Sequence, residues 1–154
     1  MRYLKLYILT LLFISLLNSC NQKESLKVSS DTITSKFTEQ QQDSLKEIYL
    51  ENGAWQTDVY SQDWQKEIDK GLQVDSTLAY FWQQKAMPLF KQSKYEVGMP
   101  FIDKAVKYNP ERWQIYRAFI KCIFSKQYKD AIIDFKDYQE TYGYGFVMDH
   151  SYNF

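Results

Sequence analysis

Few side chains in this sequence have the types and spacing that chemistry requires. His150 is the one histidine, and no CxxC, HExxH or histidine–cysteine cluster accompanies it, so we expect a solvated side chain and no metal site. Asp130, Asp134 and Asp137 lie three to four residues apart among lysines, a spacing typical of a solvated helix face. The sequence has no P-loop, no GxGxxG turn and no Ser–His–Asp set beyond chance. We therefore expect no cofactor and no enzymatic activity.

The remaining reactive side chains are two cysteines, Cys20 and Cys122. Cys20 ends a segment that starts with Arg2 and Lys5 and continues as a nearly unbroken apolar run over residues 6–17. That run would form about 18 Å of helix, too short for a hydrocarbon core of about 30 Å. The order of positive, apolar and small residues is typical of a secretory signal. Cys122 lies in a helical segment, where we expect a small buried apolar residue.

The end of this signal is more specific. Leu17-Asn18-Ser19-Cys20 resembles a bacterial lipobox. The resemblance implies a lipoprotein signal peptide over 1–19, a diacylglyceryl group on the thiol of Cys20 and acylation of the new amine. Two or three acyl chains anchor a protein stably in a membrane. Asn21 stands where Asp would retain a lipoprotein in the inner membrane, so the resemblance favours the outer membrane of a bacterial cell envelope. Residues 20–37, rich in Ser, Lys and Thr, are expected to form a flexible tether.

The body of the chain contains a repeat with a period of about 34 residues. One period separates the series Trp64, Ile68, Gly71 and Leu72 from the series Gly98, Ile102, Ala105 and Val106. Nearly the same interval separates Tyr95, Gly98 and Ile102 from Tyr128, Ala131 and Phe135. Small residues at fixed positions let antiparallel helix pairs pack closely, so the pattern predicts an all-α repeat domain.

The stretch 79–112 resembles a tetratricopeptide repeat. The matching residues are Trp82, Ala86 and Leu89 in its first helix, Gly98, Ile102 and Ala105 in its second, and the closing Pro110. Lys85 departs from the expected Leu, and Gly98 from the usual Ala. Ala131 and Phe135 continue the match in the next unit. The resemblance implies a right-handed solenoid of two and a half to three helix pairs over residues 38–143.

Periodicity and capping residues predict six helices, at 38–52, 61–74, 77–92, 94–108, 110–124 and 127–141. The expected start signals are capping boxes at Thr38–Gln41 and Ser93–Glu96, and Asn109 before Pro110. Trp64, Ile68 and Leu72 form one apolar stripe at i, i+4 and i+8. Pro88 and Pro100 lie inside predicted helices, where each removes a backbone hydrogen bond.

With no catalytic or metal site expected, the surface is the remaining candidate for function. The formal net charge is zero, which gives no reason to expect a nucleic-acid partner, and 18% of the residues are aromatic. In the family that the chain resembles, first helices line a concave groove, which here would carry Tyr80, Gln83, Met87, Phe90, Trp113, Tyr116 and Ile120. We expect a protein or peptide partner to bind there, with Tyr80, Trp113 and Tyr116 exposed together. Each of these residues suits a core equally well, and an aromatic groove would also suit a glycan.

Residues 144–154 form a C-terminal tail whose composition is typical of a loop leading into a further helix. A repeat array without a polar cap leaves apolar surface exposed at its end. Three alternatives follow: the tail folds back over the last helix pair, a partner covers that end, or the chain is a shortened form of a longer repeat protein. The alternative function is therefore that of a structural subunit of an outer-membrane complex, docking through this end.

Overall fold

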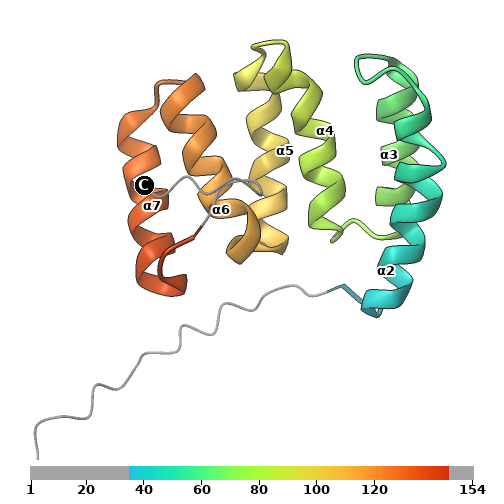
Figure 1. Ribbon diagram of the computed structural model, residues 1–154, viewed down its shortest axis with the longest axis horizontal. Coiled ribbons are helices and arrows are strands. Elements are labelled where there is room, and N and C mark those ends of the chain that lie inside the picture. Colours follow the sequence, from blue (N-terminus) through green and yellow to red (C-terminus); the bar gives the residue numbers. More distant parts are fainter. Residues whose placement is uncertain (1–34, 146–154) are drawn as a thin grey trace, which may run out of the picture. The chain divides into compact units, whose positions relative to one another are not determined.

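The computed structural model describes residues 35–145. This part of the chain is all helical, without a strand, as the sequence predicts (Figure 1). Its elements are α2 (Glu39–Lys46) continued by a π-helical turn (Glu47–Glu51), a 3-10 turn (Ala54–Gln56), α3 (Gln62–Val74), α4 (Ala79–Lys91), α5 (Tyr95–Tyr108), α6 (Pro110–Phe119) continued by a π-helical turn (Ile120–Phe124), and α7 (Tyr128–Tyr142). The predicted signal peptide, Cys20 and His150 lie outside the described residues.

Side-chain caps mark the starts of α2, α3 and α6, and the predicted helix ends lie within two residues of the observed ones. Thr38 and Gln41 form the expected capping box, and Asn109 caps α6 by accepting a hydrogen bond from the amide of Arg112. The capping box expected at Ser93 is wrong, because α5 starts after Lys94 without a side-chain cap. Ser93 instead adopts a φ of 60° in the tight turn that reverses the chain after α4.

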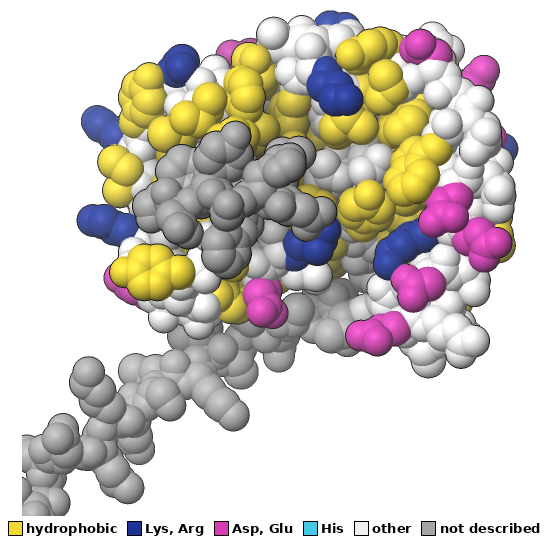
Figure 2. All heavy atoms as spheres, viewed as in Figure 1, with side chains coloured by type: hydrophobic (Ala, Val, Ile, Leu, Met, Phe, Trp, Pro, Cys, Tyr) yellow, Lys and Arg dark blue, Asp and Glu magenta, His cyan; other side chains and the backbone are white. Residues whose placement is uncertain are grey.

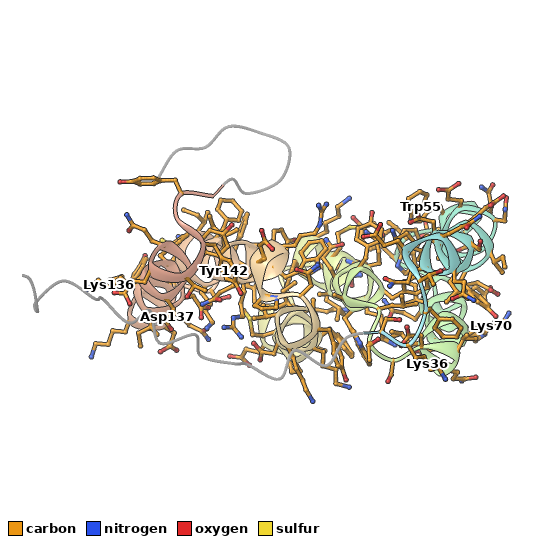
Figure 3. The ribbon with its side chains drawn as sticks, turned by 90° about the horizontal axis from the view of Figure 1, so that it is seen from below. Lys36, Trp55, Lys70, Lys136, Asp137 and Tyr142 are labelled. Atoms are coloured by element: carbon orange, nitrogen blue, oxygen red, sulfur yellow. The ribbon has the colours of Figure 1, made fainter. Side chains whose placement is uncertain are left out.

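Each helix runs antiparallel to the one before it, and neighbours along the chain pack side by side (Figure 1). Seen from below, α2, α4 and α6 lie along one side and α3 and α5 along the other (Figure 3). The small residues of the repeat sit where helices approach most closely. A Cβ on Gly71 would lie 2.2 Å from the ring of Phe81, and one on Gly98 would lie 2.5 Å from the ring of Phe90. These glycines therefore admit aromatic rings from α4.

Two apolar clusters form the core of the described region. The first contains Leu50, Ile68 and Phe81, all fully buried. The second contains Ile102 and Ala105 with residues of α4, α6 and α7. The predicted stripe on α3 is confirmed, since Trp64, Ile68 and Leu72 are all buried. Such burial is the main favourable term in folding.

Pro88 has a structural role at the contact between α3 and α4. A proline has no N–H, so the carbonyl of Gln84 lacks its usual helical donor. The indole Nε1 of Trp64 donates to this carbonyl instead, at 3.3 Å. The proline thus frees an acceptor that holds the two helices together.

Candidate functional site

Of the seven predicted groove residues, Tyr80 and Gln83 on α4 meet Trp113 and Tyr116 on α6 at a seam between the two helices. The structure buries most of the seven. Gln83, Phe90, Trp113, Tyr116 and Ile120 are buried, and Tyr80 and Met87 are half-buried. The expectation that Tyr80, Trp113 and Tyr116 are exposed together is wrong, because Trp113 is 6% and Tyr116 is 8% exposed.

The reason is that side chains of α4 and α6 meet across this seam. The rings of Tyr80 and Trp113 stack with centroids 6.0 Å apart, and Trp113 meets Tyr116 edge-on at 5.8 Å. Burial raises the pKa of Tyr116, and a hydrogen bond with the side chain of Gln83 partly offsets the rise. The aromatic residues therefore fill the space between the two helices.

A polar chain leads from this seam to the surface. Gln83 accepts a hydrogen bond from the side-chain amide of Gln84 at 2.9 Å, and Gln84 accepts one from Nε1 of Trp55 at 3.2 Å. Trp55 is 44% exposed, and sequence reasoning did not select it because it lies in an unpredicted 3-10 turn.

A pocket of about 640 Å³ opens beside the seam, on the side of α2. The start of α2, the turn between α3 and α4, the start of α4 and the junction of α5 with α6 all contribute to it. Its lining residues are Ser35, Phe37, Glu39, Gln42, Lys46, Thr77, Leu78, Ala79, Tyr80, Phe81, Tyr108, Asn109, Arg112 and Trp113. Tyr80 and Trp113 are therefore the two predicted groove residues that reach a surface where a ligand could bind.

The two cationic side chains that line this pocket differ in whether they already form an ion pair. Lys46 already binds Asp43 at 2.6 Å in an exposed pair. The guanidinium of Arg112 lies 5.1 Å from the centre of the Trp113 ring, and it has no carboxylate partner within residues 35–145. An exposed guanidinium over an aromatic ring can donate hydrogen bonds to a carboxylate, and no existing ion pair has to break first.

Acidic side chains lie along α2, which contributes Glu39, Gln42 and Lys46 to the pocket lining. Glu39, Asp43, Glu47 and Glu51 are exposed at four-residue spacing along α2 and its π-helical turn. Figure 2 shows acidic side chains grouped at the right-hand edge of this face, while hydrophobic side chains spread across its middle. The face is therefore apolar in its centre and acidic on the side of α2.

Asp75 fixes the wall between α3 and α4. Its carboxylate accepts hydrogen bonds from the hydroxyl of Ser35 and from the amide and hydroxyl of Thr77. Burial acts to raise the pKa of Asp75, but these hydrogen bonds and the charge of Lys36 outweigh it and hold the pKa below its ordinary value. The ionised side chain thus ties the segment before α2 to the start of α4.

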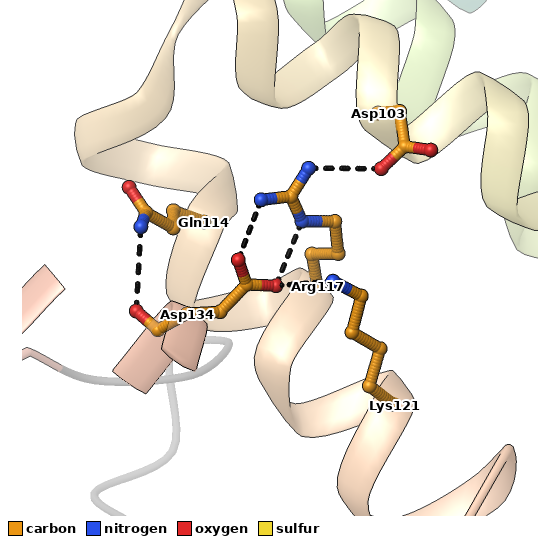
Figure 4. Close-up of polar contacts among 5 residues, drawn as sticks. All are labelled: Asp103, Gln114, Arg117, Lys121 and Asp134. Carbon is orange, nitrogen blue, oxygen red and sulfur yellow. Dashed lines mark hydrogen bonds and ion pairs between the residues drawn. The ribbon is translucent and has the colours of Figure 1, made fainter. Parts of the chain in front are cut away.

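A second cluster of charges is structural. Arg117 donates to both oxygens of Asp134 at 2.8 and 2.6 Å and to Asp103 at 2.8 Å, and Lys121 donates to Asp134 at 2.8 Å (Figure 4). Desolvation by burial acts against the charge of Arg117, yet the aspartates raise its pKa. The prediction that Asp134 lies on a solvated helix face is wrong, because Asp134 is only 4% exposed. The network joins α5, α6 and α7.

Other predicted features are less distinctive. Cys122 is a free thiol and only half-buried, so the expectation of full burial is wrong. No group of three potential ligands for a metal ion occurs among the described residues. Within the same residues, no helix has both the length and the apolar character needed to cross a membrane.

No family model, curated protein or solved structure matches the chain.

Proposed function

We propose that this chain is a lipid-anchored protein of the bacterial envelope that binds a protein or peptide partner in the pocket between α2, α4 and α6. The carrying observation is Arg112, whose guanidinium lies over Trp113 at the pocket wall without a carboxylate partner in the described region. An extended peptide that places an apolar side chain against Tyr80 and Trp113 and a carboxylate near Arg112 would match both chemistries.

We further propose that the helices form a right-handed solenoid of the tetratricopeptide type, with two and a half to three repeats. The support is the recurrence of contacts at the period of the sequence. Tyr80 and Trp113, which occupy equivalent positions one repeat apart, stack on each other. Gln83 and Tyr116 have the same spacing and are joined by a hydrogen bond. In such an array α2, α4 and α6 would be the first helices of successive repeats.

The lipid anchor rests on the sequence Leu17-Asn18-Ser19-Cys20. Acylation of Cys20 would hold the domain at a membrane surface, with the outer membrane favoured over the inner. A short tether then restricts the domain to partners in the same envelope layer and raises their effective concentration.

A structural role is the alternative, favoured by the exposed side of α7. Tyr128, Ile132 and Ile133 are 54%, 52% and 56% exposed. Apolar surface of this kind marks interaction sites more often than isolated exposed residues do. A subunit that docks through α7 would leave the pocket unused.

Photocrosslinking in intact envelopes separates these functions. Benzoylphenylalanine in place of Tyr108, which lines the pocket, should give one dominant adduct with a partner protein. The matched control is the same substitution at Tyr60, which is 55% exposed and does not line the pocket. An adduct from position 60 but not 108, or the absence of any adduct at 108, would contradict the pocket as the binding site. An adduct at Ile132 alone would support the alternative.

A further inference from the structure

Two tight turns lie next to each other at one end of the helices. The turn from α4 to α5 covers residues 92–94, and the turn from α6 to α7 covers residues 125–127. Because successive helices are antiparallel, both turns lie at the same end, which is the top in Figure 1. The ring of Tyr95 stacks on the ring of Phe124 with centroids 5.8 Å apart, so the segments beside the two turns are in contact.

The two turns have a similar backbone form. Ser93 and Lys126, which are about one repeat apart, adopt φ values of 60° and 58°, a left-handed conformation more often supplied by glycine at a helix end. In the first turn, the amide of Lys94 also donates to the carbonyl of Leu89 at 2.9 Å. Backbone hydrogen bonds thus hold the side chains beside the turns in place.

Apolar side chains at these turns are exposed. Ile123, Phe124 and Tyr128 are 41%, 42% and 54% exposed. The ring of Phe124 also meets the ring of Phe119 edge-on, with centroids 5.6 Å apart. The exposed rings therefore rest on packed rings, and grouped apolar surface of this kind marks interaction sites.

Lysines stand at the same two turns. Lys91 and Lys94 belong to the first turn, Lys126 and Lys129 belong to the second, and all four are exposed. Within residues 35–145 none of the four forms an ion pair. The ammonium groups of Lys94 and Lys126 donate to uncharged oxygens, each at 2.7 Å. These hydrogen bonds leave the positive charge uncompensated.

We name residues 91–97 and 123–130 together the turn edge. It contains four lysines and two acids, Glu96 and Asp130, so its net charge is +2. Figure 2 shows basic side chains next to hydrophobic ones over the upper ends of α6 and α7. The turn edge is therefore both apolar and basic, although the whole chain has a formal net charge of zero.

The neighbouring segment 52–61, before α3, differs in charge. It lies at the same end of the helices and exposes Tyr60, at 55%. Its one charged side chain is Asp58. Lysines and exposed apolar side chains therefore occur together at the two later turns and not along this whole end of the molecule.

This combination of residues is typical of a surface that meets lipid. Tyrosine and other aromatic side chains prefer the level of the headgroups, and apolar neighbours enter the boundary with the acyl chains. Lysines near the surface are attracted by anionic headgroups. Protein–protein interfaces are instead depleted in lysine. The composition of the turn edge therefore favours a lipid surface over a protein partner.

We propose that the turn edge docks on an anionic lipid surface. Ile123, Phe124 and Tyr128 contact the acyl boundary, and the four lysines lie among the headgroups. The proposal rests on the proposed lipid anchor, which would hold the chain at such a surface, and does not rest on the pocket. Each lysine near an anionic surface contributes about 1 kcal/mol, which is about fivefold in the ratio of docked to undocked domain.

Docking in this way turns the pocket away from the membrane. Tyr95 at the turn edge and Tyr108 in the pocket lining are the first and last residues of α5. A helix of this length separates them by about 20 Å. The pocket would then open to the aqueous phase about one helix length from the lipid.

Photocrosslinking to lipid tests the orientation. The full acylated chain is incorporated into vesicles of phosphatidylglycerol and phosphatidylethanolamine, with benzoylphenylalanine at position 128, 60 or 108. We expect lipid adducts, detected by intact mass, in several-fold higher yield from Tyr128 than from Tyr60 or Tyr108. No lipid adduct at 128, or equal yields at 128 and 108, would overturn the proposal. Equal yields at 60 and 128 would show that contact does not need the lysines, and would also overturn it.

Paired substitutions test the charge. Lys94→Gln with Lys126→Gln removes two lysines of the turn edge, and Lys104→Gln with Lys107→Gln removes two exposed lysines of α5 outside it. At about fivefold for each lysine, the ratio of docked to undocked domain should fall about 25-fold in the first double variant and stay unchanged in the second. The adduct yield at position 128 reports this ratio. Equal yields in the two double variants would overturn the role of the lysines.

Flotation with the vesicles distinguishes failure of the anchor from failure of the turn edge. A chain that does not float has neither the anchor nor the docking surface. A chain that floats but gives no lipid adduct at position 128 keeps the anchor and overturns the docking surface. In intact envelopes, a protein adduct at position 128 in place of a lipid adduct would assign this edge to a partner protein and overturn the proposal.

Discussion

At the scale of single residues, Arg117 and Asp134 form an ion pair that is largely buried. Their side chains are 18% and 6% exposed, and each depends on the other for its charge to be tolerated. Asp134→Ala leaves Arg117 and Lys121 without their shared partner, so we expect the free energy of unfolding to fall by about 3–5 kcal/mol in guanidinium denaturation. The exposed Asp130→Ala is the control and should change it by less than about 0.5 kcal/mol. Equal losses would mean that the network adds nothing to stability.

The carboxylate of Asp75 predicts a dependence of stability on pH. Its folded-state pKa lies below the ordinary value of 3.8, so its contribution is complete above pH 3.8 and is lost as the pH falls through the folded-state pKa. Asp75→Asn should therefore be less stable than the wild type at neutral pH, and the difference should narrow in acid below pH 3.8. Chemical denaturation of both proteins at neutral pH and at a pH below 3.8 measures this difference in the free energy of unfolding. A difference that stays constant would rule out the ionised carboxylate as its source.

Single residues were also the hardest scale to predict from sequence. The family resemblance placed Tyr80, Gln83, Trp113 and Tyr116 in one groove, but it did not show that these side chains pair and fill the seam between α4 and α6. A repeat determines which positions are equivalent, whereas burial depends on how closely neighbouring helices approach. Asp134 was misjudged for the same reason, since its partners Arg117 and Lys121 come from another helix.

At the scale of helices, the contact of α3 with α4 depends on a proline. Trp64→Phe removes the indole N–H and leaves the carbonyl of Gln84 without a donor, which costs about 1–3 kcal/mol beyond lost packing. In a Pro88→Ala background the new backbone N–H can satisfy that carbonyl. We expect the cost of Trp64→Phe to be smaller there by at least about 0.5 kcal/mol in a double-mutant cycle. Additive effects would show that Pro88 and Trp64 act separately.

Helices were predictable because their signals are local. Capping at Thr38 and Asn109 and the apolar stripe of α3 are properties of short segments, and they placed the helix ends within two residues. The π-helical turns at 47–51 and 120–124 and the 3-10 turn at 54–56 were not predicted. Such irregular turns adjust a helix to the packing around it, which a local pattern does not contain. The pocket was missed as well, because three separate segments of the chain form it.

At the scale of the whole molecule, the proposed acylation of Cys20 would determine where the pocket operates. We expect the mature protein to begin at Cys20 and to carry acyl chains, which intact-mass measurement and incorporation of a labelled fatty acid would detect. Cys20→Ala should lose the label, whereas Cys122→Ala, a free thiol in the helical region, should retain it. A label that persists in Cys20→Ala would place the acyl group elsewhere and remove the argument for an anchored domain.

The central claim is that the pocket beside Trp113 binds a peptide segment of a partner. Trp113 is a poor probe of this claim, because truncating a buried tryptophan costs about 3–5 kcal/mol of stability and would confuse folding with binding. Arg112 is a better probe, since its guanidinium is exposed and has no ion pair in the described region. Lys104 offers a matched control: its ammonium lies 4.0 Å from the centre of the Trp82 ring, outside the pocket.

The most direct measurement is therefore the affinity of the partner segment, identified by crosslinking at position 108, for three forms of the protein. These are the wild type, Arg112→Ser and Lys104→Ser. Loss of a charged hydrogen bond of about 1.5–3 kcal/mol predicts binding at least about tenfold weaker in Arg112→Ser, with Lys104→Ser close to the wild type. Unchanged affinity in Arg112→Ser, or an equal loss in Lys104→Ser, would contradict the pocket as the site of binding.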